Sequence, residues 1–156
     1  MKSIPSRYVF LTFAVFLLLT SFSCNTTQKT SGAAPPASMD QISISYSGMG
    51  GYIQHQIAQN QMISSVKGRG QATDDVKTEV SDQDWNKLNE LISKLDLNKF
   101  ETWEGPTQKR FHDGARATVI TIKSNDKTYT SQAFDEGNPP AELNDLYQYL
   151  ATMTKS

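Results

Sequence analysis

The chain has 156 residues, and its 15 Lys and Arg residues nearly balance its 16 Asp and Glu residues, which gives a formal net charge of −1 at pH 7. This balance argues against a nucleic-acid-binding protein, which needs a clear excess of positive charge on its surface. Cys24 is the only cysteine, so no disulfide can form within one chain. A chain of this length has room for one folded domain behind a short leader.

The first residues have the features of a bacterial export signal. Lys2 and Arg7 precede an uncharged apolar run over residues 8–19. That run is too short to span a hydrocarbon core of about 30 Å as a helix of the mature protein, so we interpret it as a leader that is removed. Because the leader carries Lys2 and Arg7, its removal makes the remaining chain more acidic.

The residues after the apolar run resemble the end of a lipoprotein signal, which typically has an aliphatic residue, two small residues and a cysteine. The corresponding residues are Ser21, Phe22, Ser23 and Cys24, of which the last two fit the pattern and the first two depart from it. We expect cleavage between Ser23 and Cys24 and lipid on the Cys24 sulfur. The alternative is ordinary secretory cleavage near Ser21 or Ser23, which would leave Cys24 as an unpaired thiol in an oxidising compartment.

Lipid on Cys24 would anchor the protein to a bilayer. Up to three fatty chains make such an anchor effectively permanent, since each buried methylene contributes about 0.8 kcal/mol. Asn25, rather than Asp, follows the cysteine, and by resemblance to known sorting rules this favours the outer membrane. The predicted organisation is a signal peptide over residues 1–23, a lipidated cysteine and flexible tether over residues 24–40, and a single α+β domain over residues 41–156.

The domain begins with patterns typical of β-strands. Ile42, Ile44 and Tyr46 alternate with serines, which predicts a half-buried strand. The glycine-rich residues 48–51 interrupt this pattern, and alternation resumes over residues 52–57, so we expect a hairpin. A third strand is predicted over residues 62–67, and residues 76–80 could form a short fourth.

Two helices and a second hairpin follow. Ser81 and Asp84 have the spacing of a capping box before an apolar stripe at three- and four-residue steps over residues 85–95. A similar stripe is expected to form a helix that starts at Asn138 or Pro139 and ends near residue 153. Between the helices, two strands are predicted over residues 116–123 and 128–134. The sequence therefore predicts an α+β fold with an antiparallel sheet of about five strands and two amphipathic helices, in the order strands, helix, hairpin, helix.

The sequence offers little support for an enzyme. His55 and His112 are the only histidines, and no metal-binding or phosphate-binding motif accompanies them, so we expect no cofactor and no metal. We expect His55 to pack within a strand and His112 to lie in a solvated turn. The acidic pairs at residues 74–75 and 135–136 are interpreted as solvated turn charges. An enzyme with a site assembled by the fold stays an alternative.

A binding surface is better supported. Trp103 follows the first predicted helix among polar residues, just before the turn residues Gly105 and Pro106, and aromatic side chains are enriched at interaction hot spots. In the alternative, Trp103 folds back onto the core. The positive residues at 109, 110 and 116, with His112, either rim this surface or face solvent. We add the turn at Gly50, Gly51 and Tyr52 to the candidate surface.

Several elements together resemble emfourin-like domains, which include a protein inhibitor of the metalloprotease protealysin. These elements are Gly50-Gly51-Tyr52, the helix over residues 85–95, Asp113 before the hairpin over residues 116–134, and the Pro-x-x-Leu-x-x-Leu pattern from Pro140 to Leu146. The chain departs from this pattern by an insertion over residues 102–111 and by its lipid signal. The resemblance implies inhibition of a metalloprotease.

The function expected from the sequence is therefore that of a lipid-anchored protein of the cell envelope, with a non-enzymatic domain that binds an envelope protein. Inhibition of a metalloprotease is the first alternative, and an envelope enzyme is the second.

Overall fold

The computed structural model describes residues 39–68, 71–72 and 74–155. The predicted cleavage and lipidation site at Ser23 and Cys24 lies outside the described residues, as do the leader and nearly all of the predicted tether.

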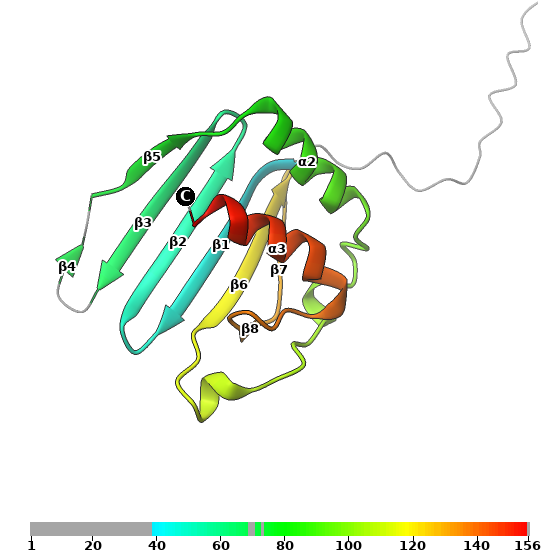
Figure 1. The fold of residues 1–156 in the computed structure, drawn as a ribbon. Coiled ribbons are helices and arrows are strands. Elements are labelled where there is room, and N and C mark those ends of the chain that lie inside the picture. Colours follow the sequence, from blue (N-terminus) through cyan, green and yellow to red (C-terminus); the bar gives the residue numbers. More distant parts are fainter. Residues whose placement is uncertain (1–38, 69–70, 73, 156) are drawn as a thin grey trace, which may run out of the picture. The chain divides into compact units, whose positions relative to one another are not determined.

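A single antiparallel sheet organises the described residues (Figure 1). Its order is β4-β3-β2-β1-β6-β7, with β5 also beside β3 and β8 also beside β6. The central strand β1 therefore pairs with β2 on one side and β6 on the other. The strands are β1 (Met39–Gly48), β2 (Gly51–Ala58), β3 (Gln61–Gly68), β4 (Gln71–Ala72), β5 (Val76–Glu79), β6 (Ala117–Ser124), β7 (Lys127–Thr130) and β8 (Phe134–Asp135).

Two α-helices pack on one face of this sheet, α2 (Asp82–Ser93) and α3 (Asn144–Met153) (Figure 1). Three short 3-10 helices lie in the connections: η1 (Phe100–Thr102), η2 (Lys109–Phe111) and η3 (Ala141–Leu143). The mixed α+β class with one antiparallel sheet and two helices is confirmed, and the elements follow the order strands, helix, hairpin, helix.

The alternation in the sequence produces the core. On the helix-covered face, Ile42 and Ile44 of β1 lie beside Ile122 and Ile120 of β6, and all four are fully buried. Each such side chain contributes roughly 1.5–3 kcal/mol when it leaves water. The helices complete this core with Trp85, Leu88, Leu91 and Ile92 from α2 and with Leu146, Tyr147, Leu150 and Ala151 from α3. The opposite face of the sheet carries mainly Ser, Thr and Gln, because every second residue points away from the helices.

The predicted capping box at the start of α2 is present. The Asp84 backbone N–H donates to Ser81 Oγ at 3.1 Å. The Tyr149 hydroxyl of α3 donates to Asp84 Oδ1 at 2.7 Å, so the same carboxylate ties the two helices together. Hydrogen bonds from Ser81 and Tyr149 lower the pKa of Asp84, whereas burial, and then the bond to Asp84, raise the pKa of Tyr149 to about 12.

Three details of the predicted fold are wrong. The described residues form eight strands rather than about five: β5 confirms the possible short strand over residues 76–80, but β4 was not predicted, and β8 results from the division of one predicted strand. The strand predicted over residues 128–134 is divided into β7 and β8. At Ser131 the side chain replaces the backbone as acceptor, because the Ile120 N–H donates to Ser131 Oγ at 3.0 Å, and this interrupts the regular ladder. Finally, α3 begins at Asn144 and not at Asn138 or Pro139. Those two residues each precede a proline, and that position disfavours helical dihedral angles.

Candidate functional site

The structure separates the residues that the sequence grouped into one candidate surface. Trp103 is half-buried against the core, with its ring edge-on to Phe100 at a centroid distance of 5.8 Å. Gly105 lies against Phe134, where a Cβ would come within 2.7 Å of the Phe134 Cβ, and Pro106 beside it is exposed. These contacts give Trp103 and Gly105 a packing role.

In the turn between β1 and β2, Gly51 likewise has a structural role. Gly51 has a φ of 135°, and a Cβ there would collide with the Lys67 carbonyl of β3. Gly50 has open space around it, and Tyr52 is half-buried on the face of the sheet opposite the helices. The exposed large side chain of this turn is that of Met49, which was not among the predicted binding residues.

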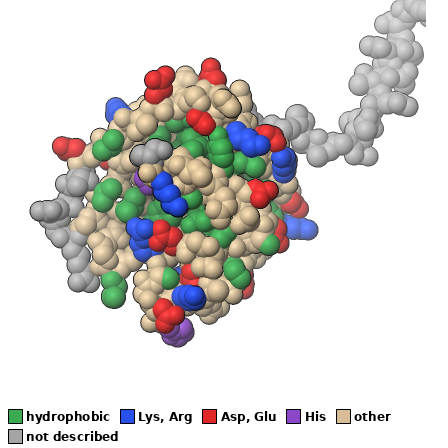
Figure 2. All heavy atoms as spheres, in the orientation of Figure 1, with side chains coloured by type: hydrophobic (Ala, Val, Ile, Leu, Met, Phe, Trp, Pro, Cys, Tyr) green, Lys and Arg blue, Asp and Glu red, His purple; other side chains and the backbone are tan. Residues whose placement is uncertain are grey.

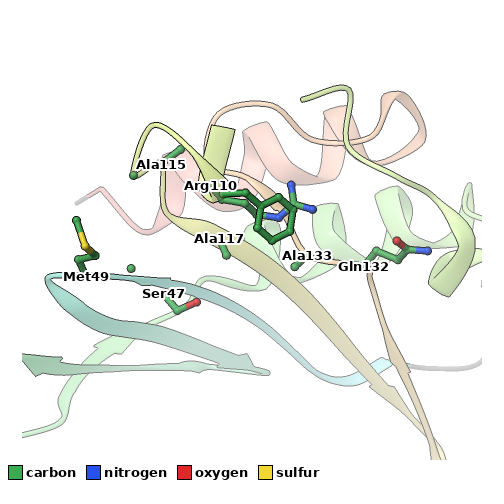
Figure 3. A pocket seen from close by; sticks show the side chains of 10 residues that line it. Ser47, Met49, Arg110, Ala115, Ala117, Gln132 and Ala133 are labelled. Atoms are coloured by element: carbon green, nitrogen blue, oxygen red, sulfur yellow. The ribbon is translucent and has the colours of Figure 1, made fainter. Parts of the chain in front are cut away.

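Met49 and Phe111 border a hollow of about 720 Å³, which we call the Met49–Phe111 groove (Figure 3). One wall comes from the β1–β2 turn, and the other comes from η2 and the residues after it. Ala115, Ala117 and Ala133 line the groove with small side chains. The turn and the loop that were predicted as candidate binding segments therefore border the same groove, but with Met49 and Phe111 rather than with Tyr52 and Trp103.

Both bordering side chains are unusually open to solvent for large hydrophobic residues. Met49 is 81% exposed and Phe111 is 66% exposed. Two such side chains beside a concave, mainly apolar surface are typical of a site that binds another molecule.

Asp135 holds one wall of the groove in place. Its side chain is 0% exposed, and it accepts hydrogen bonds from Thr107 Oγ1 at 2.6 Å, the Lys109 N–H at 2.6 Å and the Arg110 N–H at 3.0 Å. Arg110 Nη1 adds an ion pair at 3.1 Å. The interpretation of this acidic pair as solvated turn charges is therefore wrong for Asp135, because its four donors replace water.

The electrostatics follow from these contacts. Burial alone would raise the pKa of Asp135, but the hydrogen bonds from Thr107, Arg110 and Lys109 outweigh it and hold this pKa well below its ordinary value. The neighbouring Glu136 forms a two-pronged ion pair with Arg116, at 2.7 Å from Nε and 2.6 Å from Nη2.

The cations near the groove are thus largely committed to partners. Arg110 is 17% exposed in its side chain, and its guanidinium lies 4.4 Å from the centre of the Phe111 ring. Because Asp135 neutralises Arg110 and Glu136 neutralises Arg116, these two arginines do not contribute to the basic rim that the sequence allowed, whereas Lys109 and His112 are exposed in the adjoining loop. The groove is mainly apolar and has little net charge.

A second, smaller cleft of about 350 Å³ lies between α3 and β2, lined by Tyr46, His55, Glu136 and Tyr147 among others. His55 is 9% exposed, its Nδ1 lies 2.8 Å from Ser64 Oγ, and burial lowers its pKa. This agrees with the expectation that His55 packs within a strand. His112 is exposed in its loop, and neither histidine forms a hydrogen bond to a carboxylate within the described residues.

No group of three or more His, Cys, Asp or Glu side chains that could hold a metal ion occurs in the part of the chain that the structure describes. In the same part, no helix has both the length and the apolar character to cross a membrane. The chain matches no model of a known protein family and no curated protein.

Proposed function

We propose that this protein is anchored in the cell envelope by lipid on Cys24 and that its α+β domain binds a protein partner through the Met49–Phe111 groove. The observation that supports this proposal is the pairing of two highly exposed hydrophobic side chains with a loop that a buried carboxylate holds in place. A flexible loop would lose conformational entropy on binding, whereas this loop is already ordered.

The chemistry of the groove favours an apolar side chain of the partner. Arg110 and Arg116 are paired with carboxylates, so they offer little attraction to an acidic ligand. The alanines at positions 115, 117 and 133 leave room for one large side chain between Met49 and Phe111. Burial of the apolar groove surface by this side chain would make the main favourable contribution to the binding free energy.

Pull-down from envelope extract with the full-length protein tests the binding role. We expect a protein partner to be recovered with the wild type, and recovery to fall about tenfold for Phe111→Ala, as is typical when a hot-spot side chain is removed. Val66→Ala is the matched control, because Val66 is 41% exposed but lies outside both the groove and strand β5. Equal recovery with Phe111→Ala and the wild type, at equal melting temperatures, would count against the groove.

Lipid anchoring has its own test. Metabolic labelling with a fatty-acid analogue should mark the wild type and should not mark Cys24→Ser, which we expect in the soluble envelope fraction. Labelling of both proteins to the same extent would exclude the anchor and leave the groove proposal untouched.

Inhibition of a metalloprotease is the second candidate function, and the loop over residues 107–111 favours it, because an inhibitor must present a segment that resists cleavage. The full-length protein should then inhibit a thermolysin-like metalloprotease stoichiometrically, and Phe111→Ala should weaken this inhibition. Cleavage of the loop as an ordinary substrate would argue against this function.

A further inference from the structure

The strand β5 lies at an edge of the sheet (Figure 1). It pairs with β3 and, within the described residues, with no other strand. All four of its residues are exposed, and Val76 is 61% exposed. An edge strand presents unpaired N–H and C=O groups to which a further strand can bind.

The direction of these groups can be assigned from the pairing. The Val80 N–H donates to the Asn60 carbonyl at 3.2 Å, so the peptide groups of Val80 point toward the β2–β3 hairpin. The direction of the backbone N–H and C=O groups alternates along a strand. Those of Thr78 and Val76 therefore also point toward β3, whereas those of Lys77 and Glu79 point outward, away from the sheet. The side chains of Lys77 and Glu79 share one face, beside Ile63 and Gln61 of β3, away from the helices.

Around Thr78, residues at equal distances are complementary. Valines stand at positions 76 and 80, and side chains of opposite charge stand at positions 77 and 79. If a second copy pairs antiparallel with Thr78 opposite Thr78, Lys77 of each copy stands opposite Glu79 of the other. Both of these residues carry outward peptide groups, so each opposite-charge pair is also a hydrogen-bonded pair.

Other registers are less favourable. A shift that places Lys77 opposite Lys77, or Glu79 opposite Glu79, puts like charges directly across the interface. A shift by an odd number of residues would place side chains of opposite faces against each other. A lone edge lysine usually opposes pairing, but here Glu79, two residues further along, turns the same lysine into a complementary group.

We infer that β5 is a self-association edge, through which two copies of this chain form a twofold dimer with Thr78 at the axis. The two sheets then join into one continuous sheet, with two Lys77–Glu79 pairs on the face away from the helices. The exposed Val76 comes opposite Val80 of the second copy, whose own side chain is buried in its core, on the helix-bearing side where Figure 2 shows hydrophobic side chains at the surface. This contact is isologous, as in most homodimers. It involves neither Met49 nor Phe111, so it holds or fails independently of the groove.

Cysteine cross-linking tests the register. The full chain carrying Cys24→Ser, purified in a mild detergent, serves as the background, because it has no other thiol. In the inferred register the two Thr78 Cα atoms form a non-hydrogen-bonded pair about 4.5 Å apart, within reach of a disulfide. Under mild oxidation, Thr78→Cys should give a disulfide-linked dimer.

Lys77→Cys is the matched control. Each residue 77 is displaced by two residues from its counterpart, so the two Cα atoms stand about 8 Å apart, too far for a disulfide. A mixture of Lys77→Cys and Glu79→Cys proteins should cross-link to each other, because these positions are opposite. Efficient cross-linking of Lys77→Cys alone, or a monomeric Thr78→Cys protein, would overturn the inferred register.

Charge reversal tests the complementarity in the absence of a cross-link. Lys77→Glu and Glu79→Lys each place like charges opposite each other at two positions, so each should raise the dimer dissociation constant measured by sedimentation about tenfold. The double variant Lys77→Glu/Glu79→Lys restores opposite charges and should return the wild-type value. A double variant as dissociated as the single ones, or a wild type that is monomeric at every concentration, would refute the dimer. Because these side chains are exposed, the variants should keep the wild-type melting temperature.

Discussion

Arg110 meets the buried carboxylate of Asp135 twice, through its backbone N–H at 3.0 Å and through Nη1 at 3.1 Å, both at Oδ1. Asp135 belongs to β8 at the edge of β6, whereas Arg110 belongs to η2 in the long connection after α2. This contact therefore fastens the loop to the sheet immediately beside Phe111. The groove owes its shape to an interaction between segments that are distant in sequence.

Replacement of Asp135 should release the loop. In Asp135→Asn, the amide NH₂ group faces donors and the ion pair to Arg110 is lost, so we expect the melting temperature to fall by about 10 °C. Hydrogen exchange at residues 107–111 should accelerate, and partner recovery should fall with it. Glu136→Gln is the neighbouring control: its ion pair with Arg116 is partly exposed, so its effect should be much smaller. Equal effects of the two variants would show that Asp135 does not anchor the loop.

Acid should affect stability through the same carboxylate. Its pKa is depressed in the folded state, so the stability that it contributes is present above the unfolded value of about 3.9 and is lost as the pH falls below that value. Urea midpoints measured between pH 5 and pH 2.5 should therefore fall more steeply for the wild type than for Asp135→Asn. Parallel curves for the two proteins would contradict this assignment.

The fold class could be predicted because it depends on local patterns. The alternation at Ile42, Ile44 and Tyr46 and the capping box at Ser81 each lie within a few residues, and both are found as expected. The division of the strand at Ser131 could not be predicted in this way. A serine side chain that accepts from the Ile120 N–H competes with the regular ladder, and no spacing of apolar residues reveals this.

The candidate site was harder to predict for a related reason. The donors to Asp135 come from residues 107, 109 and 110, more than twenty positions earlier, so no motif connects them. Trp103 was predicted as a binding residue because it is a large aromatic residue among polar ones. Its ring instead packs against Phe100, a core residue three positions earlier. Phe111 has no such neighbour, and its aromatic ring among charged residues was the signal available in the sequence.

Thr118 provides a prediction about stability. It is fully buried on β6, between Tyr46 of β1 and Phe134 of β8, and its Oγ1 has no hydrogen-bond partner among the described residues. Thr118→Val removes this unsatisfied hydroxyl and keeps the shape of the side chain, so we expect stabilisation by about 1 kcal/mol in urea unfolding. Thr118→Ser keeps the hydroxyl and loses a methyl group, so it should destabilise the protein. If valine also destabilised it, the hydroxyl would have a partner in solution.

The buried His55 should make stability depend on pH near neutrality. Burial lowers the pKa of His55 in the folded state, whereas the unfolded chain takes up a proton near pH 6.5. Above that pH both states are neutral, and the histidine does not affect the difference between them. As the pH falls below 6.5, the unfolded state binds the proton first, so the free energy of unfolding decreases.

His55→Gln cannot take up this proton, and its amide can still bond to Ser64, so its urea midpoint should change less than that of the wild type between pH 7 and pH 5. His112→Gln, at an exposed loop position, is the control and should keep the wild-type slope. A wild-type midpoint that stays constant over this range, or a slope that flattens in the His112 variant instead, would refute the assignment to His55.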